Sequence, residues 1–250
     1  MMSDINILKV STTHEPVTCE NCNLDNLCIP KGLDRQEIGE LALLVSRNNI
    51  RQKGEAIYHS GSPFRGMIAL RSGSAKLVSL DQNGNELVVA FMLPGEIIGF
   101  DGVATQLHTC TAIALEIVNY CHLPAHKIEQ LAVNTPSLSH ILLQRSCDEL
   151  DSQVQKMFLS RRSAEERVAN FILNLSERLR VRGYSEFEFR LSMSREEIGN
   201  HLGIAHETVS RIIHLFQSRN LIEVKSKQFR IIDKKELFNF YTTYSLNSPK

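Results

Sequence analysis

Residues Ser194–Asn220 read SREEIGNHLGIAHETVSRIIHLFQSRN, and this stretch decides the fold of the C-terminal part of the chain. Ser194 and Glu197 have the S-x-x-E spacing of a capping box, which starts a helix, and Gly203 supplies the left-handed residue that commonly ends one. A second helix is expected after it, because apolar residues recur three or four positions apart. These apolar residues are Val209, Ile212, Ile213 and Phe216. The stretch therefore predicts two helices joined by a tight turn.

A polar face lies at the start of the second predicted helix, opposite its apolar stripe. It contains His206, Glu207, Ser210 and Arg211. Arg can donate two hydrogen bonds to guanine, Glu can accept one from cytosine, and Ser tolerates different bases. Such a face on the second helix of a helix–turn–helix suits binding in the DNA major groove. Glu207 and Arg211 are also four residues apart, so an ion pair that only stabilises a solvated helix would explain the same two residues.

Residues 198–217, IGNHLGIAHETVSRIIHLFQ, resemble the recognition segment of the FNR branch of the cyclic-AMP receptor protein (CRP) family of bacterial transcription regulators. That branch carries E-x-x-S-R on its recognition helix, which matches Glu207, Ser210 and Arg211. The resemblance implies a palindromic double-stranded DNA site with half-sites close to TTGAT, and RNA polymerase as a partner. His206 stands where the branch usually has an apolar residue, so we expect an altered preference at the outer end of the half-site.

The charge distribution agrees with nucleic-acid binding by the C-terminal part. The net charge of the 250 residues is zero, but residues 1–159 hold 12 Lys and Arg against 17 Asp and Glu, whereas residues 160–250 hold 16 against 11. The predicted helix–turn–helix thus lies in the positive part. No run of about eighteen apolar residues exists and the N-terminus lacks a signal pattern, so we expect a cytoplasmic protein with no membrane partner. No Ser/His/Asp set or carboxylate pair indicates an enzyme.

Three cysteines lie close together near the N-terminus: Cys19, Cys22 and Cys28, with the spacing C-x2-C-x5-C. A short loop can turn all three sulfur atoms towards one ion or cluster, and thiolates suit both zinc and iron–sulfur clusters. A zinc site and an iron–sulfur cluster each require four ligands, so a fourth ligand must come from elsewhere in the chain. The remaining cysteines are Cys110, Cys121 and Cys147. A redox-active loop without a metal is the alternative explanation.

The cysteine pattern is similar to that of FNR-type regulators, which hold an oxygen-labile 4Fe–4S cluster with a trio of this spacing, followed by an I-P or L-P pair as in Ile29-Pro30. Their fourth ligand lies in a segment ending x-C-E-I-P. Residues 119–124, NYCHLP, match it at Cys121, with His122 in place of the usual acidic residue. The resemblance implies an oxygen-responsive regulator whose 4Fe–4S cluster is coupled to dimerisation. Its implied ligands are Cys19, Cys22, Cys28 and Cys121. A regulator of the same fold with a structural zinc site, and an iron–sulfur electron-transfer protein, are the alternatives.

One helix is predicted over residues 33–47, and the pattern then changes to short apolar segments separated by turn signals. These segments are 56–58, 67–70, 76–80, 87–92 and 112–118, and the last predicted strand extends back to Thr109 and includes Cys110. Many short strands at close spacing predict an antiparallel sandwich or barrel. The stretch resembles the β-roll of the CRP family, a cupin-like jelly roll that acts as the sensor domain.

The nucleotide pocket of that family uses a Gly-Glu pair followed by an Arg-Ser pair that binds the cyclic phosphate. Gly95 and Glu96 are present here, but residues 106–109, QLHT, supply no Arg-Ser pair. An anion without an arginine partner is poorly held, so no cyclic nucleotide is expected. The turn that contains Asp81, Gly84 and Asn85 resembles the turn with which the family contacts polymerase, although an ordinary hairpin explains the same residues.

Pro136 opens a long helix that is predicted to run to about Leu159, and the helix has two apolar stripes. The first repeats with coiled-coil spacing and consists of Leu143, Cys147, Leu150, Val154 and Met157. The second, in the phase of FNR relatives, starts with Leu138, Ile141 and Leu142 and then meets Arg145, Glu149, Ser152 and Lys156. We expect a homodimer through this helix, with one stripe packed on the β-roll and the other at the dimer seam, and leave the register open.

The remaining segments complete an α+β fold. A helix capped by Ser163 precedes the helix–turn–helix, a hairpin around residues 225–227 follows it as a wing, and a last amphipathic helix starts at Asp233. The predicted organisation has four parts. They are an N-terminal cysteine-bearing segment (1–30), a β-roll sensor domain (31–135), a dimerisation helix (136–160) and a winged helix–turn–helix DNA-binding domain (161–250).

Overall fold

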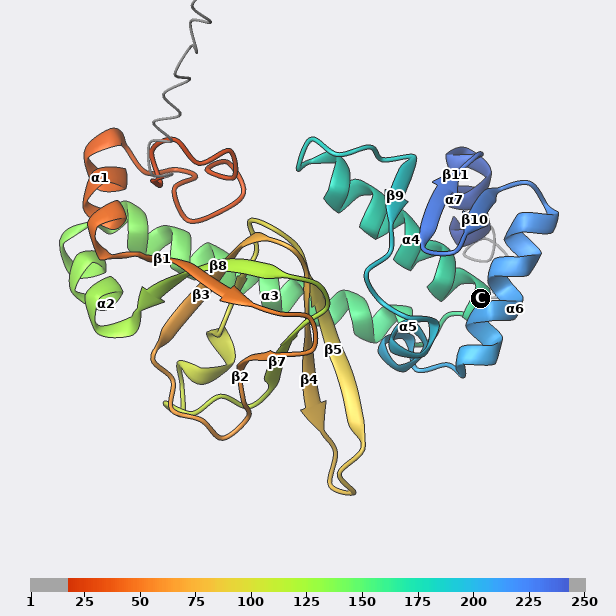
Figure 1. Ribbon diagram of the computed structural model, residues 1–250, viewed down its shortest axis with the longest axis horizontal. Helices are drawn as coiled ribbons and strands as arrows, with labels where there is room; N and C mark the ends of the chain where they lie inside the picture. Colours follow the sequence, from red (N-terminus) through yellow and green to blue (C-terminus); the bar gives the residue numbers. More distant parts are fainter. Residues whose placement is uncertain (1–17, 243–250) are drawn as a thin grey trace, which may run out of the picture.

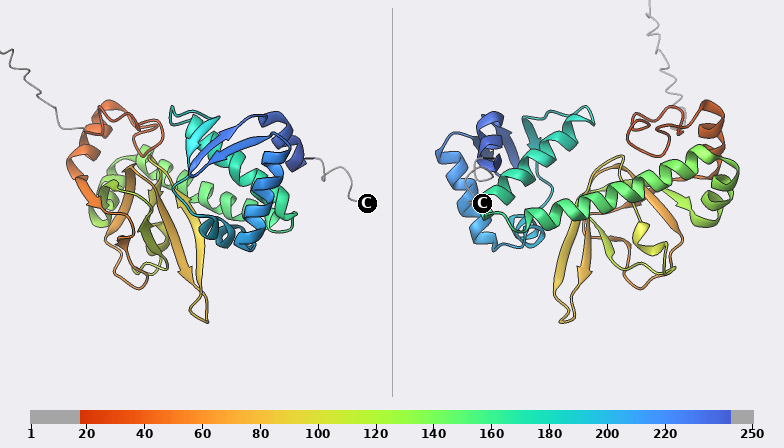
Figure 2. Two further views of the ribbon diagram at one scale, coloured as in Figure 1. Left: turned by 45° about the vertical axis from the view of Figure 1, so that its right-hand side comes forward. Right: turned by 180° about the vertical axis from the view of Figure 1, so that it is seen from behind.

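A β-roll and a winged helical domain lie side by side in the computed structural model of the chain (Figure 1), and one long helix runs along both (Figure 2). The structure describes residues 18–242, so the first part of the predicted cysteine-bearing segment lies outside the described residues. The α+β fold class is confirmed: antiparallel sheets come first, followed by the long helix and the helix–turn–helix.

Two antiparallel sheets form the β-roll. Its strands are β1 (Ser46–Arg51), β2 (Ala56–Tyr58), β3 (Gly66–Ser72), β4 (Ala75–Leu80), β5 (Glu86–Met92), β6 (Ile97–Ile98), β7 (Thr111–Ala114) and β8 (Val118–Pro124). One sheet has the strand order β1-β8-β3-β6 and the other has the order β2-β7-β4-β5. A short 3₁₀ helix, Phe100–Gly102, lies in the connection between β6 and β7. Strand β5 therefore lies at the edge of its sheet.

The helix predicted over residues 33–47 is shorter than expected. Helix α1 (Arg35–Leu44) starts at a capping box formed by Asp34 and Glu37, and β1 already begins at Ser46. Leu41 and Val45 are both buried and four residues apart, so the helical apolar spacing continues past the end of the helix. This continuation explains why the sequence predicts a helix that extends beyond the end of α1 at Leu44.

The strand predicted over residues 109–118 is wrong, because the chain forms two strands there. β7 joins the sheet of β4, whereas β8 joins the sheet of β3, and residues 115–117 cross between the two sheets. Leu115 is buried in this crossing and Ile117 is exposed. Because Leu115 and Ile117 continue the apolar alternation on either side of Glu116, the sequence reads as one continuous strand. Cys110 lies just before β7, and Cys121 lies within β8.

Helix α2 (Ala125–Asn134) leads into α3 (Pro136–Leu159), which has Pro at its first turn as predicted. The second apolar stripe of α3 begins against the β-roll, since Leu138 and Ile141 are buried. Leu138 belongs to one core cluster with Ile29, Leu41 and Leu123, and Leu142 packs against that cluster. The α3 helix is thereby fixed at its N-terminal half to both the β-roll and the segment that carries the cysteines.

The C-terminal part forms the predicted winged helix–turn–helix. Its elements are α4 (Ala164–Arg180), β9 (Glu188–Arg190), α5 (Arg195–Leu202), α6 (His206–Ser218), β10 (Ile222–Lys225), β11 (Gln228–Ile231) and α7 (Lys234–Thr242). Ser194 and Glu197 form both hydrogen bonds of the capping box, and Gly203 ends α5 at a φ of 66°. Strand β9 adds to the predicted hairpin to give a sheet of order β10-β11-β9.

Candidate cluster site and nucleic-acid interface

Four of the six cysteines line one cavity. Cys19, Cys22 and Cys28 lie in the loop before α1, and Cys121 faces them from β8, where it pairs with Ala69 of β3. Apolar side chains form much of the rest of the lining, together with two arginines. These residues are Ile29, Leu41, Val45, Leu123, Arg47 and Arg71. The loop and strand β8 are far apart in the sequence, so the fold brings together the four cysteines that the resemblance singled out.

The cysteine loop is shaped by short turns and anchored by apolar residues. Cys28 N–H donates to the carbonyl of Leu24 (2.9 Å), and Leu24 and Ile29 are buried. Arg145 of α3 donates from its Nη2 atom to the carbonyl oxygens of Leu27 (2.9 Å) and Cys28 (3.3 Å). The loop is therefore bonded directly to the long helix, a contact that the sequence did not indicate.

Burial sets the protonation of the cysteine thiols. Burial, with a smaller contribution from the neighbouring Cys121, raises the pKa of Cys28 to about 12. Burial also raises the pKa values of Cys19 and Cys121, while Arg47 lowers both and donates a hydrogen bond to Cys19. Thiols with raised pKa values stay protonated unless positive charge is placed between them, so metal binding at this cavity would release protons.

The other two cysteines lie elsewhere. Cys110 is buried in the β-roll, where its thiol donates to Asp101 (3.4 Å) and lies 3.9 Å from the hydroxyl of Tyr58. Burial and the charge of Asp101 raise the pKa of Cys110 to about 12. Cys147 is exposed on α3. Neither residue lines the cavity of the four cysteines.

The polar face at the start of α6 points outward. His206, Glu207 and Arg211 are exposed and Ser210 is half-buried, whereas Val209, Ile212, Ile213 and Phe216 are buried on the opposite side. His206 Nε2 lies 3.2 Å from Glu207 Oε1. A Cβ atom at Gly199 would lie 2.7 Å from the carbonyl oxygen of Ile204, so glycine is required where α5 and the turn meet. This close approach sets the tight turn between α5 and α6.

The β4–β5 hairpin projects away from the body of the protein (Figure 2). Its tip is built on Asp81, whose carboxylate accepts hydrogen bonds from Asn83 N–H and Asn85 N–H (2.8 Å each) and from the Asn85 side chain (2.8 Å). These bonds lower the pKa of Asp81. Gly84 adopts a φ of 81°. Asp81, Gly84 and Asn85 thus shape an exposed turn.

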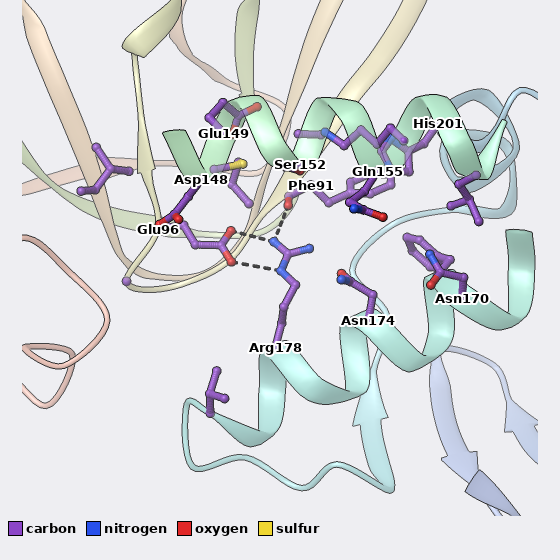
Figure 3. Close-up of a pocket in the computed structure, with 18 of the residues that line it drawn as sticks. Phe91, Glu96, Asp148, Glu149, Ser152, Gln155, Asn170, Asn174, Arg178 and His201 are labelled. Atoms are coloured by element: carbon purple, nitrogen blue, oxygen red, sulfur yellow. Dashed lines mark hydrogen bonds and ion pairs between the residues drawn. The ribbon is translucent and has the colours of Figure 1, made fainter. Parts of the chain in front are cut away.

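Glu96 is bonded to two arginines of the C-terminal part, and Figure 3 shows the bonds from Arg178. Arg178 donates to both of its carboxylate oxygens (3.0 and 2.6 Å), and Arg182 donates to one of them (2.6 Å). Arg182 is almost fully buried in this contact. Composition and spacing gave no sign of these partners, since they lie more than 80 residues from Glu96 in the sequence.

The first apolar stripe of α3 is solvent-exposed. Leu143, Leu150 and Met157 are between 63% and 68% exposed, Val154 is 46% exposed and Cys147 is also exposed. The second stripe faces its own chain, because Arg145 bonds the cysteine loop and Lys156 Nζ lies 3.4 Å from the carbonyl of Val89.

A β-roll, a long helix and a winged helix–turn–helix with an exposed polar face on its second helix define a DNA-binding transcription regulator. Comparisons with known proteins agree. Residues 166–240 match the family described as Crp-like helix-turn-helix domain, and residues 51–135 match that described as Cyclic nucleotide-binding domain. None of the described helices is long and apolar enough to cross a membrane.

Similar proteins cover most of the chain. Transcriptional activator protein Anr of Pseudomonas protegens is 40% identical over 90% of this chain and 92% of its own length. Fumarate and nitrate reduction regulatory protein of Vibrio cholerae is 36% identical over 88% of this chain and 89% of its own. The structure of FixK2 from Bradyrhizobium japonicum superposes with a TM-score of 0.72 at 25% identity, covering 78% of this chain and 96% of that one. The chain belongs to the CRP/FNR family of transcription regulators, and it is not an enzyme.

Proposed function

We propose that this regulator responds to oxygen through a 4Fe–4S cluster bound by Cys19, Cys22, Cys28 and Cys121, and that the cluster controls dimerisation. The observation that carries the proposal is the shared cavity of these four side chains, which belong to two distant segments. Relatives named for fumarate and nitrate reduction, such as the Vibrio cholerae protein, support a link to anaerobic metabolism.

The donor set fits an iron–sulfur cluster. Thiolates are the usual ligands of such clusters, and apolar surroundings limit the access of water. Arg47 and Arg71 lie close enough to stabilise a negatively charged thiolate at Cys121. Among the described residues no three His, Cys, Asp or Glu side chains converge as ligands of a single ion. Four thiolates can bind either a 4Fe–4S cluster or a zinc ion, and analysis of iron, acid-labile sulfide and zinc distinguishes the two.

The chain offers a direct path from the cluster site to the dimer helix. The cluster would supply positive charge that holds the loop cysteines and Cys121 together. Arg145 holds the loop carbonyls of Leu27 and Cys28, and Ile29 packs in the same core cluster as Leu138 of α3. A displaced loop would therefore disturb α3. Oxygen would shift the balance between monomer and dimer because the two states differ in their affinity for the intact cluster.

The exposed apolar stripe of α3 is the surface that a second copy of the chain would cover. Its residues, Leu143, Cys147, Leu150, Val154 and Met157, have the spacing of a coiled-coil seam and are solvent-exposed. Asp148 and Asp151 lie beside the stripe and are exposed, so their symmetry mates would repel each other across the dimer. This repulsion would keep the protein without its cluster largely monomeric.

The dimer would place two copies of α6 in successive major grooves about one helical turn apart. His206, Glu207, Ser210 and Arg211 would contact the bases of TTGAT-like half-sites, and the turn with Asp81, Gly84 and Asn85 would contact RNA polymerase. We expect no cyclic nucleotide, because the Glu96 carboxylate is already bonded to Arg178 and Arg182.

Iron and acid-labile sulfide per chain, measured in anaerobically purified protein, test the proposal. The parent and Cys110→Ala should both contain about four of each, as a 4Fe–4S cluster requires. Cys121→Ala should lose most of both. Zinc in place of iron and sulfide would contradict the cluster, and equal loading of Cys121→Ala would contradict the ligand assignment.

A further inference from the structure

Strand β5 has an unusual neighbour on its outer edge. It pairs with β4 on one side and lies at the end of the strand order β2-β7-β4-β5. An exposed strand edge presents a row of unpaired backbone groups, which proteins normally protect. Here the edge faces helices α3, α4 and α5, and side chains from all three bond to its backbone.

Five side-chain bonds follow the edge from one end of β5 to the other. The amide of Asn200 donates to the carbonyl of Glu86 (2.7 Å) and accepts from Val88 N–H (2.6 Å). His201 Nδ1 lies 2.9 Å from the carbonyl of Val88 and must donate to it. Lys156 Nζ lies 3.4 Å from the carbonyl of Val89, and Arg178 Nη2 lies 2.6 Å from that of Phe91. These bonds take the place of a further strand.

The same edge carries an apolar contact and a charged one. The ring of Phe91 packs edge-on against Phe171 and His201, with centroids 5.9 and 5.1 Å apart. Val88 and Phe91 belong to the same core cluster as the buried residues of α5 and α6. Beyond the end of the strand, the Glu96 carboxylate forms ion pairs with Arg178 and Arg182. Polar and apolar contacts thus hold the helix–turn–helix against this edge.

The covalent connection between α3 and the winged helix–turn–helix domain is short. Helix α3 ends at Leu159 and α4 begins at Ala164, so residues 160–163 alone connect them. A rotation at this link would move α6 relative to the β-roll and to the long helix. Asn200 lies on α5, which packs directly on α6 at Gly199, so a fixed Asn200 also fixes the direction of α6.

We propose that the outer edge of β5 is the surface that orients the helix–turn–helix, and that Asn200 and Arg178 are positioning residues for DNA binding. Their role is to hold the two copies of α6 at the separation that a two-half-site duplex requires. A pre-oriented pair binds more tightly because less motion is lost on binding. The proposed base-contacting residues, such as the exposed Arg211, act separately, since none of the side-chain bonds to β5 described above involves them.

The test uses the cluster-loaded full-length protein and duplexes that carry the two-half-site sequence selected by the parent protein from random DNA. The distance between half-site centres is varied by one and two base pairs in each direction. The parent should bind one spacing best. Asn200→Ala and Arg178→Ala should each lose about tenfold at that spacing and less than about threefold at the others, which flattens the profile.

Arg180→Ala is the matched control for Arg178→Ala, because Arg180 lies two residues further along α4 and pairs with the exposed Glu177. It should keep the parent profile. Glu96→Gln perturbs the same contact from the β-roll, outside the DNA-binding domain, and should also flatten the profile. The proposal is overturned if the variants lose affinity equally at every spacing, if they keep the parent profile, or if the parent itself shows no preferred spacing.

Discussion

Arg145 provides a sharp test of the link between the cysteine loop and the long helix. Its guanidinium is half-buried and donates to Leu27 O at 2.9 Å and to Cys28 O at 3.3 Å. The second distance is near the outer limit of a good N–H···O bond, so the pair counts as about one charge-assisted bond. Such a bond contributes about 1.5–3 kcal/mol. Because Arg145 is partly exposed, we expect the lower end, about 1.5 kcal/mol.

In Arg145→Ala all four cysteines remain, so iron and sulfide should stay at the parent level. The dimer should dissociate about tenfold more readily, since about 1.4 kcal/mol corresponds to a factor of ten. Anaerobic sedimentation across a concentration series measures this, with the exposed neighbour Gln144→Ala as the control. An unchanged dimerisation constant in Arg145→Ala, with the cluster intact, would refute the proposed path from loop to helix.

Four further predictions follow from the same structure. Arg211→Ala should cost about 1–3 kcal/mol on a specific duplex in a binding titration and little on random DNA; equal losses on both would exclude base contact. Asn85→Asp should reduce transcription activation in a reporter assay while DNA binding persists, whereas joint loss of both would indicate misfolding. A short bis-maleimide should cross-link dimers through exposed Cys147 in anaerobic protein but not in Cys147→Ser, and failure with the parent would exclude this seam. Burial lowers the pKa of His201 below its unfolded value of about 6.5, so the native state disfavours its protonation and stability is lost as pH falls below that value. Urea unfolding from pH 7.5 to 5.5 should show a steeper decline for the parent than for His201→Gln, and parallel curves would contradict this.

Local patterns in the sequence were sufficient for the helix–turn–helix and for the long helix. The capping box of Ser194 and Glu197, the left-handed Gly203 and the apolar stripe of α6 each have a short-range physical cause, and each is found in the structure. The predicted ends of helices and strands were wrong where the apolar pattern of one element continued into the next. This happened at Val45, between α1 and β1, and at residues 115–117, between β7 and β8.

Contacts between distant segments could not be read from spacing. Spacing alone left Cys110, Cys121 and Cys147 as equal candidates beside the cysteine trio, and only the resemblance selected Cys121. The structure adds a physical distinction, since β8 carries Cys121 into the cavity of the trio. The bonds of Asn200 to β5 and of Arg178 to Glu96 join residues more than 80 positions apart, and no local pattern signals such pairs.

Sedimentation of anaerobic and air-exposed protein tests most directly whether the cluster controls assembly of the dimer. The parent and Cys121→Ala would be compared at one concentration, with the iron and sulfide content measured in the same samples. We predict that the anaerobic parent sediments as a dimer, and that the air-exposed parent and Cys121→Ala in either condition sediment mainly as monomers. A dimer of unchanged stability in all four samples would contradict the claim, even if the anaerobic parent contained a complete cluster.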